Sequence, residues 1–233
     1  MVLMTTDVNA PRKYRSTKRA MQAKNTRLQL LSAAWTLFTE RGYVATTVAQ
    51  IAHAAGTSVD TLYEAVGRKP VLLRQVVESA ISGLDQTIPA ERRDYVQRIR
   101  ETPDAATKLQ VYAAAIAAMS PRTAPIFLAL RDAARTDQDC AALHKEISTR
   151  RATNMLLLAA DLRLTGALRP DLSDEVIGDI VWATAGAEHY TQLVDSRGWS
   201  AERFGDYLYE MWSRLFLASP GTPLNQGRVP GPP

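Results

Sequence analysis

Three short amphipathic helical patterns, separated by turns, fill residues 27–73 and constrain the fold of this chain more than any other feature. The first pattern carries apolar residues at steps of three and four, which form one stripe along an α-helix: Leu28, Leu31, Trp35 and Phe38. We predict that this helix ends at Gly42, because glycine adopts the left-handed stop conformation without steric cost.

The second and third patterns are short, and each begins at a capping residue. Thr47 and Gln50 have the spacing of a capping box, which predicts the start of a second helix. A glycine then breaks the chain, and the hydroxyl of Thr57 or Ser58 can cap a third helix over residues 59–66. Two short helices joined by a glycine-containing turn are typical of a helix-turn-helix.

The sequence of these helices resembles the tetracycline-repressor (TetR) family. The resemblance covers the N-terminal third of the chain and is carried by the runs AAWTLF, RGY, TTVAQIA, AAG and TLY, and by Lys69 ahead of a Leu-Leu pair. It implies an all-α protein in which an N-terminal three-helix DNA-binding domain with a helix-turn-helix is followed by a C-terminal helical bundle for ligand binding and dimerisation. In that family the third helix enters the major groove of DNA.

Carried over by position, the resemblance assigns DNA contacts to Thr47, Thr57, Ser58, Val59, Asp60, Thr61, Tyr63 and Lys69. Thr47, Tyr63 and Lys69 would hold phosphates, and the others would face base edges. The chemistry of these residues agrees, because backbone N–H groups at a helix start, with a Lys nearby, form an anion site. Asp60 can accept a hydrogen bond from cytosine N4, and Thr61 can hydrogen-bond a base or touch a thymine methyl group.

The chain departs from the family pattern after the tyrosine of the third helix. Glu64, Ala65 and Val66 stand where relatives often carry an aromatic or His pair followed by Phe, and Pro70 stands where an acidic residue is common. Phosphate repels the carboxylate of Glu64, which must therefore point away from the DNA backbone or read a base. We carry over no family contact at positions 64 or 65.

Positive charge is concentrated in the N-terminal part of the chain. Residues 1–70 contain ten Lys or Arg against four Asp or Glu, a balance of +6. The remainder contains eighteen basic and twenty acidic residues, a balance of −2, and the two values add up to the net charge of +4. This distribution is expected of a phosphate-binding domain attached to a domain that does not bind DNA.

The two ends of the chain differ in composition from the rest. Residues 1–24 are basic and lack apolar periodicity, which predicts a flexible arm that either reaches DNA or remains a solvated tail. Residues 219–233 are rich in Pro and Gly, which predicts a disordered tail. The single cysteine, Cys140, fits a reducing cytosol. With no signal-peptide pattern and no apolar run long enough to cross a bilayer, we expect a cytoplasmic protein without a membrane partner.

The DNA-binding domain is expected over residues 25–70 and a larger helical domain over residues 71–218. Pro70 suits the first turn of a helix, whereas Pro121 and Pro125 predict a break. The helical segments expected after residue 83 are 104–119, 126–135, 139–164, 176–194 and 201–217. No strand alternation of useful length is evident, so the larger domain is expected to be a helical bundle.

The TetR resemblance further implies that the bundle binds a small effector and that its last two long helices pair with those of a second subunit. Small and large apolar residues in these helices permit such a homodimer: Trp182, Ala183, Ala185, Gly186, Ala187, Tyr207, Met211, Trp212 and Leu215. Either helix could instead be internal core. A dimer would place two recognition helices about 34–36 Å apart, which matches a palindromic operator.

Candidate effector contacts are aromatic, flexible or polar residues within otherwise apolar helices: Tyr112, Met119, Phe127, Arg131, Asn154, Trp182 and His189. For each of them, ordinary core or surface placement is the alternative. Asn154 is the most suggestive because it stands among apolar residues. Arg131 could neutralise an anionic ligand or pair with Asp132 or Asp161 on the surface.

The helix-turn-helix pattern and the TetR resemblance together imply a sequence-specific transcriptional regulator, most simply a repressor that a small molecule releases from double-stranded operator DNA. Repressor and activator are not distinguished, because the sign depends on where the operator lies. A DNA-binding protein without an effector is the alternative. A helical enzyme lacks support, since the three histidines are far apart without metal spacing and neither a phosphate-cradling loop nor a G-x-S-x-G turn occurs. We expect no cofactor and no metal.

Overall fold

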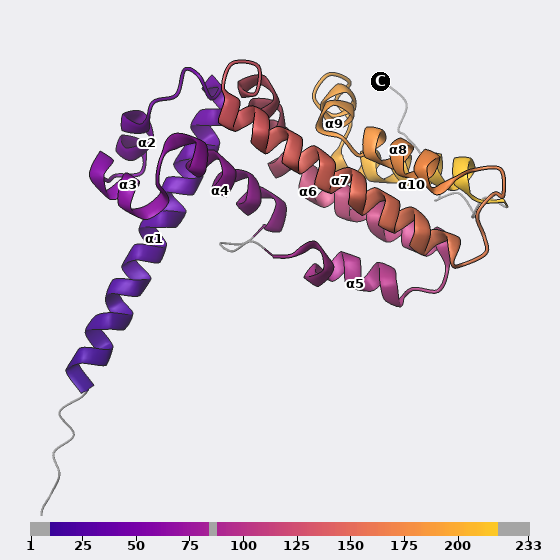
Figure 1. Cartoon of the computed structure of the whole chain (residues 1–233), viewed down its shortest axis with the longest axis horizontal. Coiled ribbons are helices and arrows are strands. Elements are labelled where there is room, and N and C mark those ends of the chain that lie inside the picture. Colours follow the sequence, from indigo (N-terminus) through magenta and orange to yellow (C-terminus); the bar gives the residue numbers. More distant parts are fainter. Residues whose placement is uncertain (1–9, 84–87, 219–233) are drawn as a thin grey trace, which may run out of the picture. The chain divides into compact units, whose positions relative to one another are not determined.

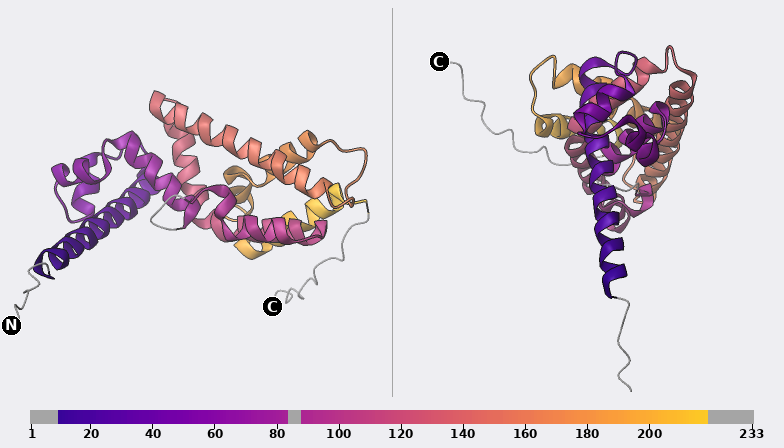
Figure 2. Two further views of the ribbon diagram at one scale, coloured as in Figure 1. Left: turned by 60° about the horizontal axis from the view of Figure 1, so that its bottom comes forward. Right: turned by 90° about the vertical axis from the view of Figure 1, so that its left-hand side faces the viewer.

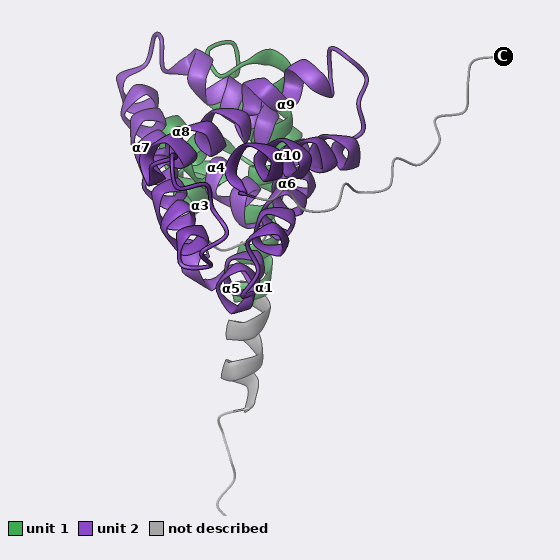
Figure 3. Cartoon of the chain, turned by 90° about the vertical axis from the view of Figure 1, so that its right-hand side faces the viewer, with its two compact units in different colours: residues 1–76 green, residues 77–233 purple. Residues whose placement is uncertain are grey.

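The computed structural model describes residues 10–83 and 88–218. They belong to two compact units, which divide between Val76 and Val77 (Figure 3). Within the described residues the secondary structure is helical, apart from one isolated bridge between Leu168 and Leu217. The predicted all-α fold class is therefore confirmed.

The first unit is built on one long helix. Its elements are α1 (Ala10–Arg41), α2 (Val48–Ala54), α3 (Val59–Val66) and the first part of α4 (Lys69–Ser82). The helices α2 and α3 pack against each other and against the C-terminal part of α1, whose N-terminal turns extend beyond them (Figure 1). The core of this unit contains Leu30, Ala34, Phe38, Ile51, Leu62, Leu72 and Leu73, all fully buried.

Residues 10–24 differ from the sequence prediction, because they belong to α1 and not to a flexible arm. The missing apolar stripe has a simple explanation: residues 19–25 are exposed, so this part of α1 packs against no other element. Arg, Lys, Met, Gln and Ala are good helix formers, and they extend a helix already nucleated by its packed C-terminal part. Residues 1–9 of the predicted arm and the predicted tail at 219–233 lie outside the described residues.

The turn between α1 and α2 is fixed by two residues. Gly42 has a φ of 79°, the left-handed conformation expected of a helix stop. The buried hydroxyl of Thr46 donates to the carbonyl oxygens of Leu37 and Gly42, at 3.1 and 2.8 Å. These bonds tie the turn to the end of α1 and so set where α2 starts.

The second unit is a bundle around a central helix. It contains the end of α4, the 3-10 turn η1 (Ala90–Arg92), α5 (Asp94–Glu101), α6 (Ala105–Ala133), α7 (Gln138–Arg163), α8 (Asp174–Thr184), α9 (Ala187–Leu193) and α10 (Ala201–Phe216). The central helix α6 packs against α5, α7, α9 and α10, and α7 also packs against α8 (Figure 2). The aromatic centre of the core is Trp212, whose ring stacks on Tyr112 at 5.7 Å.

Two helix boundaries in this unit were predicted wrongly. Pro121 and Pro125 lie inside α6 and do not end it. Each proline removes one backbone hydrogen bond at a cost of about 3 kcal/mol, but packing on four sides holds the helix together. Conversely, the segment predicted as one helix over 176–194 divides at Gly186 into α8 and α9.

The apolar character of α6 also corrects an expectation. An 18-residue window of this helix has a mean hydropathy of 1.4, so α6 is long and apolar enough to cross a membrane by length and composition. Half of the window is buried inside the protein, and a core helix passes the same test. The packing described above accounts for this composition.

Candidate DNA-binding face and effector cavity

The start of α3 is organised by two hydroxyl groups. Ser58 adopts an extended conformation, and its Oγ accepts a hydrogen bond from the backbone N–H of Thr61 at 3.1 Å. The two hydroxyl oxygens are 2.9 Å apart and share a second hydrogen bond. The predicted cap of the third helix is therefore present, and it fixes the orientation of Thr61 at the beginning of the helix.

The two faces of α3 differ in chemistry. Leu62 and Val66 are buried against the rest of the unit. Asp60, Tyr63 and Glu64 are exposed, and Tyr63 keeps 48% of its surface accessible. The exposed face thus carries a phenol, which can donate to a phosphate, and two carboxylates that make no ion pair among the described residues. The carboxylates suit contacts with base edges more than with phosphates.

Cationic and backbone groups that suit phosphate lie at the starts of α2 and α4. Thr47 and Gln50 form the predicted capping box, with the backbone N–H of Thr47 donating to Gln50 Oε1 at 2.9 Å. Lys69 is the first residue of α4, and its Nζ lies 4.0 Å from the centroid of the Tyr43 ring. A cation beside a helix N-terminus is a favourable place for a phosphate. The predicted DNA contacts therefore lie on the exposed surface of one unit, although the contacts themselves stay predictions.

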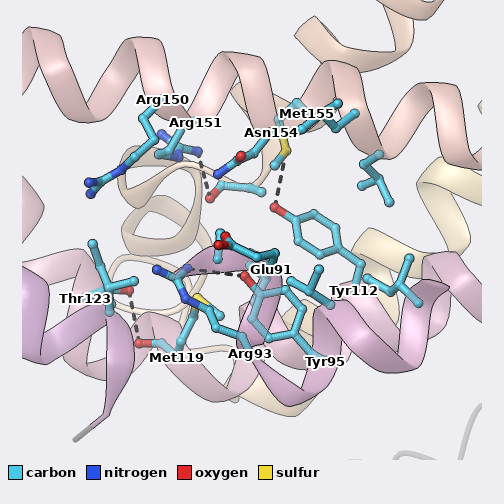
Figure 4. A pocket seen from close by; sticks show the side chains of 18 of the residues that line it. Glu91, Arg93, Tyr95, Tyr112, Met119, Thr123, Arg150, Arg151, Asn154 and Met155 are labelled. Carbon is cyan, nitrogen blue, oxygen red and sulfur yellow. Dashed lines mark hydrogen bonds between the residues drawn. The ribbon is translucent and has the colours of Figure 1, made fainter. Parts of the chain in front are cut away.

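The second unit contains a cavity of about 580 Å³ lined by side chains from α4, α5, α6 and α7 and by η1 (Figure 4). This volume lies within the range typical of small-molecule sites. Four of the predicted effector residues line it: Tyr112, Met119, Phe127 and Asn154. The hydroxyl of Tyr112 donates to Met155 Sδ at 3.2 Å, and burial raises the pKa of this phenol.

The other three predicted effector residues do not line this cavity. Arg131 lies at the surface, where it pairs with Asp132 at 3.1 Å and Glu188 at 3.0 Å, so the alternative of surface pairing is correct for it. Trp182 packs against Arg151 and donates its indole N–H to a backbone carbonyl of α7. The ring of His189 lies among aromatic rings of α10.

The sequence analysis missed the arginines of the cavity wall. Arg93, Arg150 and Arg151 all line it, together with Tyr95. Arginines within helices usually have solvated head groups, so the residue type alone did not indicate that these three arginines line a cavity. The spacing of two residues did indicate a shared location, because Arg151 and Asn154 are three residues apart and therefore lie on the same face of α7.

Two contacts join α4 to the wall of the cavity. Arg150 Nη2 donates to Glu78 Oε1 at 2.9 Å, and the Glu78 side chain is only 13% exposed. Arg122 Nε donates to the carbonyl oxygen of Ala80 at 2.7 Å. The C-terminal turns of α4 are thus held by one arginine of α7 and one of α6.

The outer side of α10 carries a stripe that is not fully covered. Tyr207, Met211 and Leu215 follow one another at steps of four, and the first two are half-buried while Leu215 is 40% exposed. Trp212, which was grouped with them, points the other way: it is fully buried and its Nε1 donates to Thr184 Oγ1 at 2.9 Å. Trp212 is therefore a core residue.

Residues 30–76 match the sequence model of the family described as "Bacterial regulatory proteins, tetR family". This range coincides with the helices whose caps and exposed faces are described above. The chain carries a TetR-family DNA-binding domain. The recognised resemblance is thereby confirmed for this part of the sequence.

A curated relative of this TetR domain is the HTH-type transcriptional regulator HbdR of Aromatoleum sp. (strain CIB). The two are 37% identical over 65 residues, which is 28% of this chain and 28% of the relative. The match thus spans little more than the TetR domain, and the relative gives no sequence information about the second unit.

Solved structures resemble this chain over most of its length. Native NalD of Pseudomonas aeruginosa, described as the secondary repressor of the MexAB-OprM multidrug efflux pump, has a TM-score of 0.66 and 18% identity, covering 86% of this chain and 100% of its own. FadR of Bacillus subtilis in complex with stearoyl-CoA has a TM-score of 0.64 and 17% identity, covering 79% and 96%. A transcriptional regulator of Saccharomonospora viridis in complex with choline has a TM-score of 0.62 and 17% identity, covering 83% and 98%. At these identities the likeness establishes the fold alone.

The family model matched by residues 30–76 describes bacterial regulatory proteins. Within residues 10–83 and 88–218, no group of three or more His, Cys, Asp or Glu side chains is arranged to hold a metal ion.

Proposed function

We propose that this chain is a transcriptional regulator that binds operator DNA through α3 and changes its affinity for DNA when a small molecule occupies the cavity of the second unit. The carrying observation is the capped α3 with its exposed polar face, within a domain that matches the TetR family. A cavity of ligand size in the same chain supports control by an effector. Repression relieved by the effector is the simplest form, and such a protein acts in the cytoplasm, where the DNA is.

The active form is proposed to be a homodimer. The stripe of Tyr207, Met211 and Leu215 on α10, with the exposed Val176 on α8, supplies apolar surface for a partner copy. A two-fold dimer would present two copies of α3 to a palindromic operator. Replacement of Met211 by Glu should yield monomers in sedimentation velocity, because it places a charge in the middle of the stripe. A Met211→Glu protein that still sediments as a dimer would assign the interface elsewhere.

The proposed coupling runs along α4. This helix begins with Lys69 beside the predicted phosphate contacts and ends at the cavity wall, where Glu78 pairs with Arg150. A ligand that shifts this wall would change the position of α4. By linkage, effector and operator then weaken the binding of each other by the same factor.

The direct test is selection of genomic fragments by the purified protein at an ionic strength of about 0.15 M. A recovered palindrome with half-sites about one helical turn apart supports a dimeric regulator. Genes beside the recovered sites would then suggest metabolites to examine. Recovery of no sequence above background by a folded protein would contradict operator-specific regulation.

A DNA-binding protein without an effector is the second candidate, and it predicts the same fragments. The two candidates differ in one result, which is whether any small molecule that binds the second unit also releases operator DNA. Ligand binding with unchanged operator affinity would favour the second candidate.

A further inference from the structure

Three arginines on the wall of the cavity make no ion pair among the described residues, and Arg151 is the partly buried one that keeps unused nitrogens. Arg100 is exposed, and Arg93 already donates through all three of its nitrogens. Arg151 lines the cavity, is partly buried and makes no ion pair among the described residues. Two carboxylates of the wall are already paired: Glu78 with Arg150, and Asp161 with Lys108 at 2.5 Å. The third, Glu91, is exposed and makes no ion pair with Arg151. A buried charge without a counter-ion is costly, so such an arrangement is retained where a ligand supplies the opposite charge.

The guanidinium of Arg151 is held in one orientation. Its Nη2 donates to the carbonyl oxygens of Trp182 and Ala185, at 3.0 and 3.3 Å, where α8 ends before the break at Gly186. Its centre lies 5.5 Å from the ring of Trp182. Only one nitrogen is used in this way. Nε and Nη1 have no hydrogen-bond acceptor within the described part of the chain, so they remain for a ligand.

Burial lowers the pKa of Arg151, which is the expected direction for a cation removed from water. An anionic ligand would reverse this effect. The backbone carbonyls at the end of α8 already provide partial negative charge, and a carboxylate would complete the neutralisation.

A second donor lies beside this guanidinium. Asn154 is one helical turn further along α7 and also lines the cavity, and its amide makes no hydrogen bond with any described residue. Figure 4 shows Arg151 and Asn154 together on α7, with Tyr112 below them. Because the free N–H groups of Nε and Nη1 lie on different edges of the guanidinium, one of them together with the amide N–H of Asn154 matches the two oxygens of one carboxylate.

The rest of the wall is largely apolar. Ile116, Met119, Phe127 and Leu158 line the cavity together with the rings of Tyr95 and Tyr112. This surface suits a hydrocarbon or aromatic body. With Arg93 and Arg150 already engaged, one guanidinium N–H next to one amide offers few donors for a dianionic phosphate, which usually needs several cations or a helix N-terminus.

From this arrangement we infer that the effector is a monocarboxylate with an apolar body, whose carboxylate binds Arg151 and Asn154 while its body fills the space between α5, α6 and α7. The inference rests on the proposed function and specifies the ligand class of the same cavity. It is distinct from the ligands named for the structural relatives, one a thioester and the other a cation.

The test uses the full-length protein and matched probes that differ only in the head group. The probes are decanoate, decanamide and decyltrimethylammonium, with phenylacetate and phenylacetamide as an aromatic pair and decanoyl-CoA as a thioester. Binding is measured by calorimetry and by the shift in melting temperature. The variants are Arg151→Gln and Asn154→Leu, with Lys145→Gln as a charge-matched control on an exposed position of α7.

We expect the carboxylates to bind more tightly than their amides. Arg151→Gln should weaken carboxylate binding about ten- to hundredfold, the usual range for a hydrogen bond to a charged group, and should bring acid and amide to similar affinity. Lys145→Gln should leave this ratio unchanged. If Arg151 serves only to bind the end of α8, its replacement would weaken acids and amides equally, and the inference would be wrong.

Three other results would also overturn it. The first is tighter binding of the amide, the ammonium compound or the thioester than of the free acid. The second is loss of the preference for acids in Arg93→Gln but not in Arg151→Gln. The third is that no carboxylate of the panel binds. Operator binding is measured separately on the same preparations. If the protein prefers carboxylates but selects no DNA sequence, the proposed function alone is contradicted. If it binds DNA specifically but shows no preference for carboxylates, only this inference is contradicted.

Discussion

Gly205 on α10 and Ala117 on α6 approach so closely that a Cβ atom on Gly205 would lie 2.9 Å from the Cβ of Ala117. Real Cβ atoms essentially never come this close, and neither atom belongs to a flexible side-chain end. The backbones of the central helix and the last helix of the second unit therefore approach each other closely at this point. The contact lies between two sites, the cavity on one side of α6 and the apolar stripe on the outer side of α10.

Gly205→Ala should therefore destabilise the protein. Overpacking costs about 1–3 kcal/mol, and it opposes a helix-propensity gain of about 1 kcal/mol from replacing glycine. We expect a net loss of up to about 2 kcal/mol in the free energy of unfolding, measured by urea denaturation. Asp206→Ala, at the exposed neighbouring position, is the control. A more stable Gly205→Ala protein would show that α6 and α10 can move apart without cost.

Lys69→Ala should lower affinity for all DNA sequences by a similar factor. A lysine that neutralises one phosphate contributes about 0.9 to the slope of log affinity against log salt, so the slope should fall by that amount. Titration of an operator and of random DNA at several salt concentrations measures it. Because Lys69 also lies over the Tyr43 ring, the melting temperature of the variant must be compared with that of the parent. An unchanged slope would remove Lys69 from the DNA contacts.

Thr61→Ala should instead change which bases are preferred. The hydroxyl of Thr61 is fixed by Ser58 at the start of α3, where a small side chain can reach a base edge. Repeating the fragment selection with the variant should give an altered consensus at one position of each half-site. An equal loss of affinity on every sequence would indicate that Thr61 supports the helix cap and reads no base.

The ion pair between Glu78 and Arg150 is expected to contribute to effector-dependent release of DNA. A partly exposed pair contributes about 0.2–1 kcal/mol, so Glu78→Arg or Arg150→Glu alone should reduce the ratio of operator affinities without and with effector by up to about fivefold. The double variant, in which the charges are exchanged, should recover most of the ratio. Equal ratios in all four proteins would place the coupling outside this pair.

His189 predicts a pH dependence of stability. Its Nε2 is buried without a hydrogen-bond partner in the described residues, and burial lowers its pKa from the ordinary 6.5. The unfolded chain then binds more protons than the folded one as pH falls below about 6.5, so stability is lost in that direction. Melting temperatures should decline in acid, and less so in His189→Leu. His144→Gln, which removes an exposed histidine, should retain the full decline.

Local signals predicted the first unit well because its helices begin and end at residues with specific backbone preferences. The capping box at Thr47, the cap at Ser58 and the stop at Gly42 depend on groups within three or four residues of each other. Such interactions can be read from spacing. The N-terminal turns of α1 were missed because a solvated helix without an apolar stripe resembles a tail in composition.

The second unit was predicted less completely, because its decisive contacts join distant parts of the chain. The prolines of α6 are tolerated only through packing by four other helices, and the break at Gly186 is stabilised by Arg151, which is far away in sequence. Of the candidate effector residues, Asn154 was found because a polar side chain among apolar neighbours is a local anomaly. The place of Arg151 on the cavity wall was not predicted, because a helical arginine usually has a solvated head group and the lack of an ion pair is visible only in three dimensions.

The contact between α6 and α10 has a consequence for how the protein is made. A ribosome completes α6 well before it reaches α10. At typical synthesis rates of about 5–20 residues per second, the apolar face of α6 around Ala113 and Ala117 therefore remains uncovered by α10 for several seconds. During that interval the nascent chain displays a stretch hydrophobic enough to pass for a membrane span. We therefore expect chaperones to bind the nascent chain at this stage. We also expect rapid degradation of chains that stop before residue 201, because they lack the helix that covers α6.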